Sequence, residues 1–183
     1  MPIRIGLQVV RLAKPLVCRY LPGLFVLVSY GISLLVFFWL YTKFSDTRHA
    51  ETILHWNADA TGFLVRILSI DASVQDNVVT SGPLALTIVL ECTSLPFLSI
   101  LFAGIIAFPS TIFQKLWGAV LGAVILSLVN LVRITSLLLI GLSFPSALDS
   151  AHILVWQALM IITAVSLWIL WWRNIEGRER LQT

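Results

Sequence analysis

Apolar residues along this chain are gathered into long runs that no charged side chain interrupts. Three stretches carry no Asp, Glu, Lys or Arg, namely 20–42, 92–114 and 150–172. A fourth stretch, 116–148, holds a single charge, at Arg133. Because a helix needs about 20 apolar residues to cross a bilayer, this pattern predicts four transmembrane helices. Their expected ranges are 22–42, 95–114, 116–141 and 151–172.

The segment between the first two predicted spans, residues 43–91, has a different pattern. Within 53–70, apolar residues recur at helical spacing with polar residues on the other face, which is typical of an amphipathic helix at a membrane surface. Residues 73–79 and 84–90 are rich in β-branched and apolar side chains and flank the turn sequence TSGP, which predicts a β-hairpin. The predicted hairpin leads directly into Glu91 and Cys92.

Composition excludes a soluble domain. Of the 183 residues, 58% are hydrophobic and 11% are charged, whereas soluble domains carry about 25% charged residues. We therefore expect one domain over residues 1–183, an all-α integral membrane bundle of about four spans. An extracytoplasmic amphipathic helix and a short β-hairpin complete the expected fold.

The distribution of charge predicts the orientation of the bundle. Eight basic residues flank the predicted spans on one side: Arg4, Arg11, Lys14, Arg19, Lys115, Arg173, Arg178 and Arg180. Positive residues concentrate on the cytoplasmic side of membrane proteins. We therefore expect a cytoplasmic basic arm over 1–19, a cytoplasmic tail over 173–183 and an extracytoplasmic segment over 43–91, in the cell membrane. Because the orientation of the protein in the bilayer accounts for these basic residues, no nucleic-acid partner is expected.

Arg133 is the residue that topology does not explain. A guanidinium within a span costs about 2.5–3.5 kcal/mol on insertion scales, and such residues usually face a cavity or a partner. Asn130 lies one turn earlier on the same helix face. A structural alternative remains open, in which Arg133 reaches the interface or binds carbonyl groups at a helix end.

Two further residues lie at the same predicted depth on the outer side. Cys92 precedes the apparent cap and first turn of the second span, and a helix N-terminus stabilises a thiolate. His152 is expected in the first turn of the last span, capped by Asp149 or Ser150. Taken singly, the cysteine could be an inert apolar residue and the histidine an interfacial one.

Taken together, these residues form a complete set for acyl transfer. Cys92 would be the nucleophile, His152 the acid and base, and Arg133 the group that stabilises the thiolate or an oxyanion. Glu91, Asn130 and Asp149 are supporting candidates that could equally be caps or bridges. A metal is not expected, because one Cys and one His fall short of the ligands that zinc takes, and no other cofactor is indicated.

The ordered set resembles the exosortase/archaeosortase family. Its residues are ECTSL at the start of one span, N-L-V-R from Asn130 to Arg133 in the next, and His152 opening the last. The resemblance covers roughly residues 60–172 and suggests a small member, with Thr93 and Ser94 standing where the family usually has a small residue and then glycine.

The resemblance implies a membrane-embedded cysteine transpeptidase whose active site faces outward. Its partners would be secreted proteins that end in a short motif, a hydrophobic helix and a basic cluster. Cys92 would form a thioacyl-enzyme, Arg133 would stabilise the thiolate or oxyanion, and His152 would protonate the leaving amine and activate the acceptor. Two alternatives stay open: a thiol protease or lipid-acyl transferase with the same residues, and a non-catalytic scaffold or transporter subunit in which Arg133 pairs a partner helix.

Overall fold

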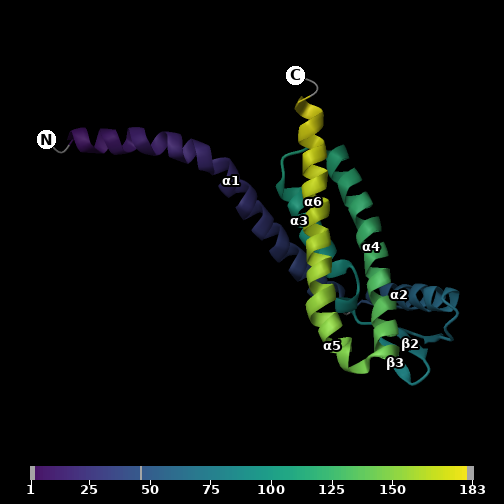
Figure 1. Cartoon of the computed structure of the whole chain (residues 1–183). Coiled ribbons are helices and arrows are strands. Elements are labelled where there is room, and N and C mark those ends of the chain that lie inside the picture. The colour runs from purple at the N-terminus through teal and green to yellow at the C-terminus, as the bar shows by residue number, and fades with distance from the viewer. Residues whose placement is uncertain (1–2, 46, 181–183) are drawn as a thin grey trace.

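The fold was obtained as a computed structural model, which describes residues 3–45 and 47–180, with side chains described for 23–45 and 47–177. Helices dominate it (Figure 1). They are α1 (Ile3–Phe44), α2 (Arg48–Ile67), α3 (Leu95–Ala107), α4 (Ile112–Ser143), α5 (Leu148–Ser150) and α6 (Gln157–Arg180). Shorter turns are the 3-10 helices Leu90–Cys92 and Pro145–Ala147 and the π-helix Ala151–Trp156.

The all-α membrane bundle expected from the sequence is confirmed. Three helical stretches of the described chain are long and apolar enough to cross a bilayer: Gly23–Phe44, Ile112–Ser143 and Pro145–Gly177. The second predicted span, 95–114, is instead the 13-residue helix α3. At about 1.5 Å per residue α3 is about 20 Å long, less than the hydrocarbon thickness of about 30 Å.

The sequence around Pro109 explains why α3 is short. The residue before a proline is disfavoured in helical conformation, and Phe108 is extended, with φ −84° and ψ 133°. A new helix begins immediately afterwards, because Thr111 and Gln114 form a capping box at the start of α4. The apolar run therefore contains a helix end and a helix start that hydropathy alone did not reveal.

The other predicted spans are longer in the structure. The first, 22–42, continues without a break from the predicted arm 1–19 as helix α1. The last, 151–172, starts earlier, at Pro145, and continues through most of the predicted tail 173–183 to the end of α6. The two extreme ends of the chain lie outside the described residues.

The amphipathic helix expected over 53–70 is α2, which begins earlier and ends at Ile67. Ser69 follows in left-handed conformation (φ 62°). The Ser69 N–H donates to Arg66 O and the Ile70 N–H to Val65 O, at 2.9 and 3.2 Å, the pattern of a Schellman helix end. This reversal returns the chain across α2 into the sheet.

The predicted hairpin is a three-stranded antiparallel sheet of β1 (Ser73–Gln75), β2 (Val78–Ser81) and β3 (Leu84–Thr87), in that order. The prediction of one strand over 73–79 was wrong, because the chain turns at Asp76, which has φ 56°. Aspartate tolerates this left-handed conformation better than most residues. The second turn contains Gly82 (φ 53°), whereas the preceding Thr80 and Ser81 belong to β2.

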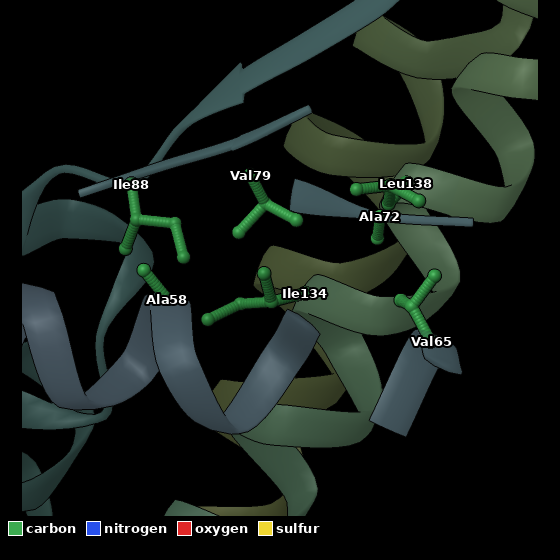
Figure 2. Packing of buried hydrophobic residues seen from close by; sticks show 7 residues of the cluster. All are labelled: Ala58, Val65, Ala72, Val79, Ile88, Ile134 and Leu138. Atoms are coloured by element: carbon green, nitrogen blue, oxygen red, sulfur yellow. The ribbon is translucent and has the colours of Figure 1, made fainter. Parts of the chain in front are cut away.

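A buried cluster fixes the sheet and α2 against one end of α4 (Figure 2). α2 contributes Ala58 and Val65, the sheet Val79 with the adjoining Ile88, and α4 Ile134 and Leu138; Ala72 completes the cluster. A second cluster joins α3, α4 and α6 through Phe97, Leu101, Ile105, Leu126, Met160 and Ala164. Arg133, one residue before Ile134, lies where these two units meet.

Candidate active site

Cys92 ends a 3-10 turn just ahead of α3. The Thr93 hydroxyl stabilises this junction, since its Oγ1 donates to Leu90 O at 2.6 Å and accepts from Leu95 N at 3.3 Å. Ser94 is the N-cap residue of α3. The half-buried thiol therefore lies two residues before the N-cap, as the sequence predicted.

Arg133 is completely buried, with 0% of its side chain exposed. Its Nη1 donates to Asn130 Oδ1 at 3.3 Å, and its guanidinium carbon lies 5.7 Å from the centre of the Phe97 ring. Its Nε has no hydrogen-bond partner within the described part of the chain. Such an N–H can donate to an oxygen that reaches it.

His152 lies in the π-helix rather than in the first turn of a capped helix. The expected caps are wrong: α5 starts at Leu148, so Asp149 and Ser150 are already helical, and neither side chain forms a capping hydrogen bond. π-helical turns are rare and occur often at functional sites.

The His152 imidazole contacts both the Arg133 guanidinium and the Cys92 thiol. Arg133 Nη2 donates to His152 Nε2 at 3.0 Å, and Cys92 Sγ lies 3.9 Å from the same nitrogen. Because a guanidinium has only donors, Nε2 must accept, which places the ring proton on Nδ1. His152 is thus neutral in this structure, with its Nε2 lone pair between the guanidinium and the thiol.

The three groups line one cavity of about 270 Å³. The remaining wall is mostly apolar and comes from the β3 segment, α4 and α5; its members are Leu86, Thr87, Ile88, Val89, Ile134, Leu137, Leu148 and Asp149. The structure therefore brings together the three residues that the sequence suggested for acyl transfer, from three separate elements.

The three supporting candidates differ in whether they reach the site. Asn130 holds Arg133, and its Nδ2 donates at 3.5 Å to Asn57 Oδ1. Asp149 lines the cavity beside His152. Glu91 does not line it, and accepts a hydrogen bond of 3.3 Å from Tyr41 OH on α1.

Sequence reasoning missed Asn57 and Phe97, which contact Asn130 and Arg133. The one sequence signal for Asn57 is its spacing of four residues from Thr61, which puts two uncharged polar residues on one helix face. In the structure Thr61 is buried. The apolar spacing expected within 53–70 runs instead through Trp56, Phe63 and Ile67, which lie on a different face of the helix and are exposed in the structure. In the described residues no three His, Cys, Asp or Glu side chains gather as a metal site needs.

Fold and site together define a polytopic membrane protein with a buried Cys–His–Arg cluster at one end of its bundle. The chain belongs to the transmembrane exosortase family, whose family model matches residues 2–172. This confirms the resemblance stated from Cys92, Arg133 and His152. No curated protein and no solved structure matches the chain.

Proposed function

We propose that this protein is a cysteine transpeptidase that cleaves C-terminal sorting signals of secreted proteins and transfers the product to an acceptor. The main support for this proposal is that Cys92, His152 and Arg133 line one cavity. A nucleophile, a base within reach and a cation for developing negative charge are what acyl transfer needs.

The first half-reaction follows from the contacts. His152 Nε2 takes the proton of the Cys92 thiol while Sγ bonds to the carbonyl carbon of the scissile peptide. Arg133 donates to the developing oxyanion, which a guanidinium with a free Nε–H can do. The imidazolium then gives its proton to the leaving nitrogen, the C–N bond breaks, and a thioester remains on Cys92.

The second half-reaction returns the enzyme to its starting state. The acceptor nucleophile attacks the thioester carbon, its proton passes to His152 Nε2, and the C–S bond breaks. The Cys92 thiolate recovers the proton from the imidazolium. Arg133 assists in both half-reactions. When His152 is protonated, its Nε2–H faces an N–H of the guanidinium, and two donors cannot hydrogen-bond to each other. The imidazolium therefore releases its proton readily.

We also propose that the cavity faces outward and that both termini are cytoplasmic, in the cell membrane. The basic residues at the chain ends support this orientation. The exposed Trp56, Phe63 and Ile67 of α2 support an interfacial position for that helix. The substrates would be secreted proteins with a C-terminal motif, a hydrophobic helix and a basic cluster, as the family resemblance implies.

The proposed activity is tested with Cys92→Ala in cells that also produce a sorting-signal protein. We expect unprocessed substrate to accumulate while the variant reaches wild-type abundance in the membrane, because only the nucleophile is lost. Leu68→Ala, an exposed position at the end of α2 and away from the cavity, is the control and should process normally. Normal processing by Cys92→Ala would refute the proposal.

The scaffold alternative assigns Arg133 to a partner helix. A fully buried guanidinium that contacts His152, Asn130 and Phe97 of its own chain gives that alternative no support.

A further inference from the structure

Strand β3 forms one border of the sheet. The strand order is β1-β2-β3, so no described strand pairs with the far side of β3. The extended conformation continues past Thr87, because Val89 has φ −111° and ψ 168°. This extended run, Leu84–Val89, ends three residues before Cys92.

The direction of the backbone groups along this run follows from one contact. Ile88 N donates to Asn77 O at 2.8 Å, on the side of β2. Backbone groups of successive residues in an antiparallel strand point to alternate sides. The backbone groups of Leu84 and Leu86 therefore also point toward β2. The opposite, outward side carries the N–H and C=O groups of Ala85 and Thr87 and the N–H of Val89.

The outward side of the run forms part of the cavity. Four consecutive residues, Leu86 to Val89, line it together with Cys92 and His152. Since side chains alternate between the two faces of a strand, four consecutive lining residues indicate that the cavity borders the edge of this run rather than one of its faces. The unpaired backbone groups thus border the cavity that holds the nucleophile.

The sequence places no charged residue and no proline along this edge. Natural edge strands usually carry lysine, proline or inward charges that prevent pairing with another chain. The run LALTIVL from Leu84 to Leu90 has no charge and no proline. Across the sheet, β1 has Asp71 and Asp76 on either side of it.

We propose that the substrate segment around the scissile bond binds as an additional β-strand along the outward edge of Ala85–Val89. Strand addition uses main-chain hydrogen bonds for affinity, and here it would deliver an extended peptide to Sγ of Cys92. The inference rests on the proposed function, and it identifies the substrate segment as extended rather than helical at the point of cleavage.

Peptide electrophiles test this pairing in the full-length protein. They can be used without knowing which sorting motif the protein recognises. The probe is acetyl-trialanine vinyl sulfone, with one N-methylated version for each amide and with methyl vinyl sulfone as the probe that lacks a peptide. The readout is the rate of labelling of Cys92, measured by mass spectrometry of the peptide that contains it.

Strand pairing predicts faster labelling by the peptide probe than by methyl vinyl sulfone. It also predicts that N-methylation slows labelling about five- to tenfold at alternate amides only, since each blocked amide loses one hydrogen bond. Equal labelling by all probes, or equal slowing at every amide, would overturn the proposal.

A protein variant provides the complementary test. Thr87→Pro removes an outward N–H and leaves the β2 ladder its donors, so it should abolish the preference for the peptide probe. Thr87→Val keeps the N–H and should retain the preference. Iodoacetamide labelling of Cys92 is measured in both variants and gives the intrinsic thiol reactivity against which the peptide preference is normalised. If Thr87→Pro does not fold, the N-methyl series decides alone.

The two proposals fail differently. If Cys92→Ala still processes a sorting-signal protein, the proposed function is wrong whatever the probes show. If Cys92→Ala stops processing and the alternating pattern is absent, only the strand addition is wrong.

Discussion

The side chains of Cys92 and Arg133 both lie against one nitrogen, Nε2 of His152, at the end of this bundle. His152 Nε2 accepts from Arg133 and faces the Cys92 thiol, so the guanidinium and the thiol proton compete for a single lone pair. Deprotonation of Cys92 therefore requires Arg133 Nη2 to yield that lone pair. In the proposed mechanism, the substrate carbonyl oxygen becomes a stronger acceptor for the guanidinium than the imidazole is as Sγ attacks and negative charge develops, so transfer of the thiol proton to Nε2 and formation of the oxyanion would proceed together.

Arg133→Lys tests the role of the guanidinium. Lysine keeps the charge but lacks the planar fork that contacts Asn130 and His152 together. We expect turnover of a sorting-signal substrate to fall by about 10²–10³, the usual loss on removal of an oxyanion donor. Ser136→Ala is the matched control on α4, because the Ser136 hydroxyl donates to the Arg133 carbonyl oxygen and not to the guanidinium. A Lys variant as active as Ser136→Ala would contradict the assigned role.

The sequence was sufficient to propose Cys92, Arg133 and His152 as candidates, because a thiol, a guanidinium and an imidazole at one membrane depth are unusual on apolar helices, and the structure places the three side chains around one cavity. It was not sufficient for Phe97 or Asn57. Their contacts with Arg133 and Asn130 arise only when α3 and α2 pack on α4. Such contacts are properties of tertiary structure, which hydrophobic periodicity does not encode.

Among the elements, α2 acts on the site indirectly, through the contact of Asn57 with Asn130, and lines no wall of the cavity. Its small residues, including Ala58 and Gly62, face the protein, and the sheet approaches so closely that a Cβ on Gly62 would meet Val74. Asn57 extends from this face to Asn130, which in turn holds Arg133. α2 thereby contributes to the position of the guanidinium.

Asn57→Ala should reduce turnover several-fold with little change in KM, because it loosens Asn130 and Arg133 without touching the cavity wall. Partial rescue by Asn57→Asp, which restores the Oδ1 acceptor, would separate positioning from a general effect on folding. Asp59→Ala, an exposed change on the same helix, serves as the control. Equal kinetics for Asn57→Ala and Asp59→Ala would exclude the positioning role.

The contact between α4 and α6 depends on Gly118. A Cβ there would meet the Trp171 indole, whose Nε1 donates to Gln114 O at 2.9 Å. We expect Gly118→Ala to lower stability by about 1–3 kcal/mol, as overpacking usually does. The thermal unfolding midpoint in detergent would report it. Gly31→Ala has open space around the new methyl group and should be neutral or slightly stabilising, so equal midpoints would contradict the packing argument.

Across the whole molecule, the sheet and α2 lie at one end of the bundle and the C-terminal end of α6 lies at the other (Figure 1). The cavity is at the end that holds the sheet, because residues of the β3 segment line it. Hydropathy predicted this membrane bundle correctly, because lipid exposure imposes long apolar helices. It placed the end of the second span wrongly, because Pro109 and the Thr111 cap act locally within an apolar run. It also missed the turn at Asp76, which depends on one left-handed residue.

The proposed orientation is tested with single cysteines at the two ends, in a background with both native cysteines replaced by serine. Asp76→Cys, in an exposed turn of the sheet, should react with a membrane-impermeant maleimide on intact cells. Gly177→Cys, near the end of α6, should react only after permeabilisation. The reverse pattern would place the cavity on the cytoplasmic side.

In the proposed mechanism, Cys92 carries the cleaved substrate as a thioester. The most direct measurement incubates the purified full-length protein with a sorting-signal substrate in the absence of acceptor and determines the mass of the Cys92-containing peptide. We predict an adduct equal to the substrate fragment on the amino-terminal side of the cut, released by hydroxylamine and absent from Cys92→Ala. Cleavage of the substrate at an undiminished rate by Cys92→Ala, with no adduct on the wild-type thiol, would contradict the mechanism.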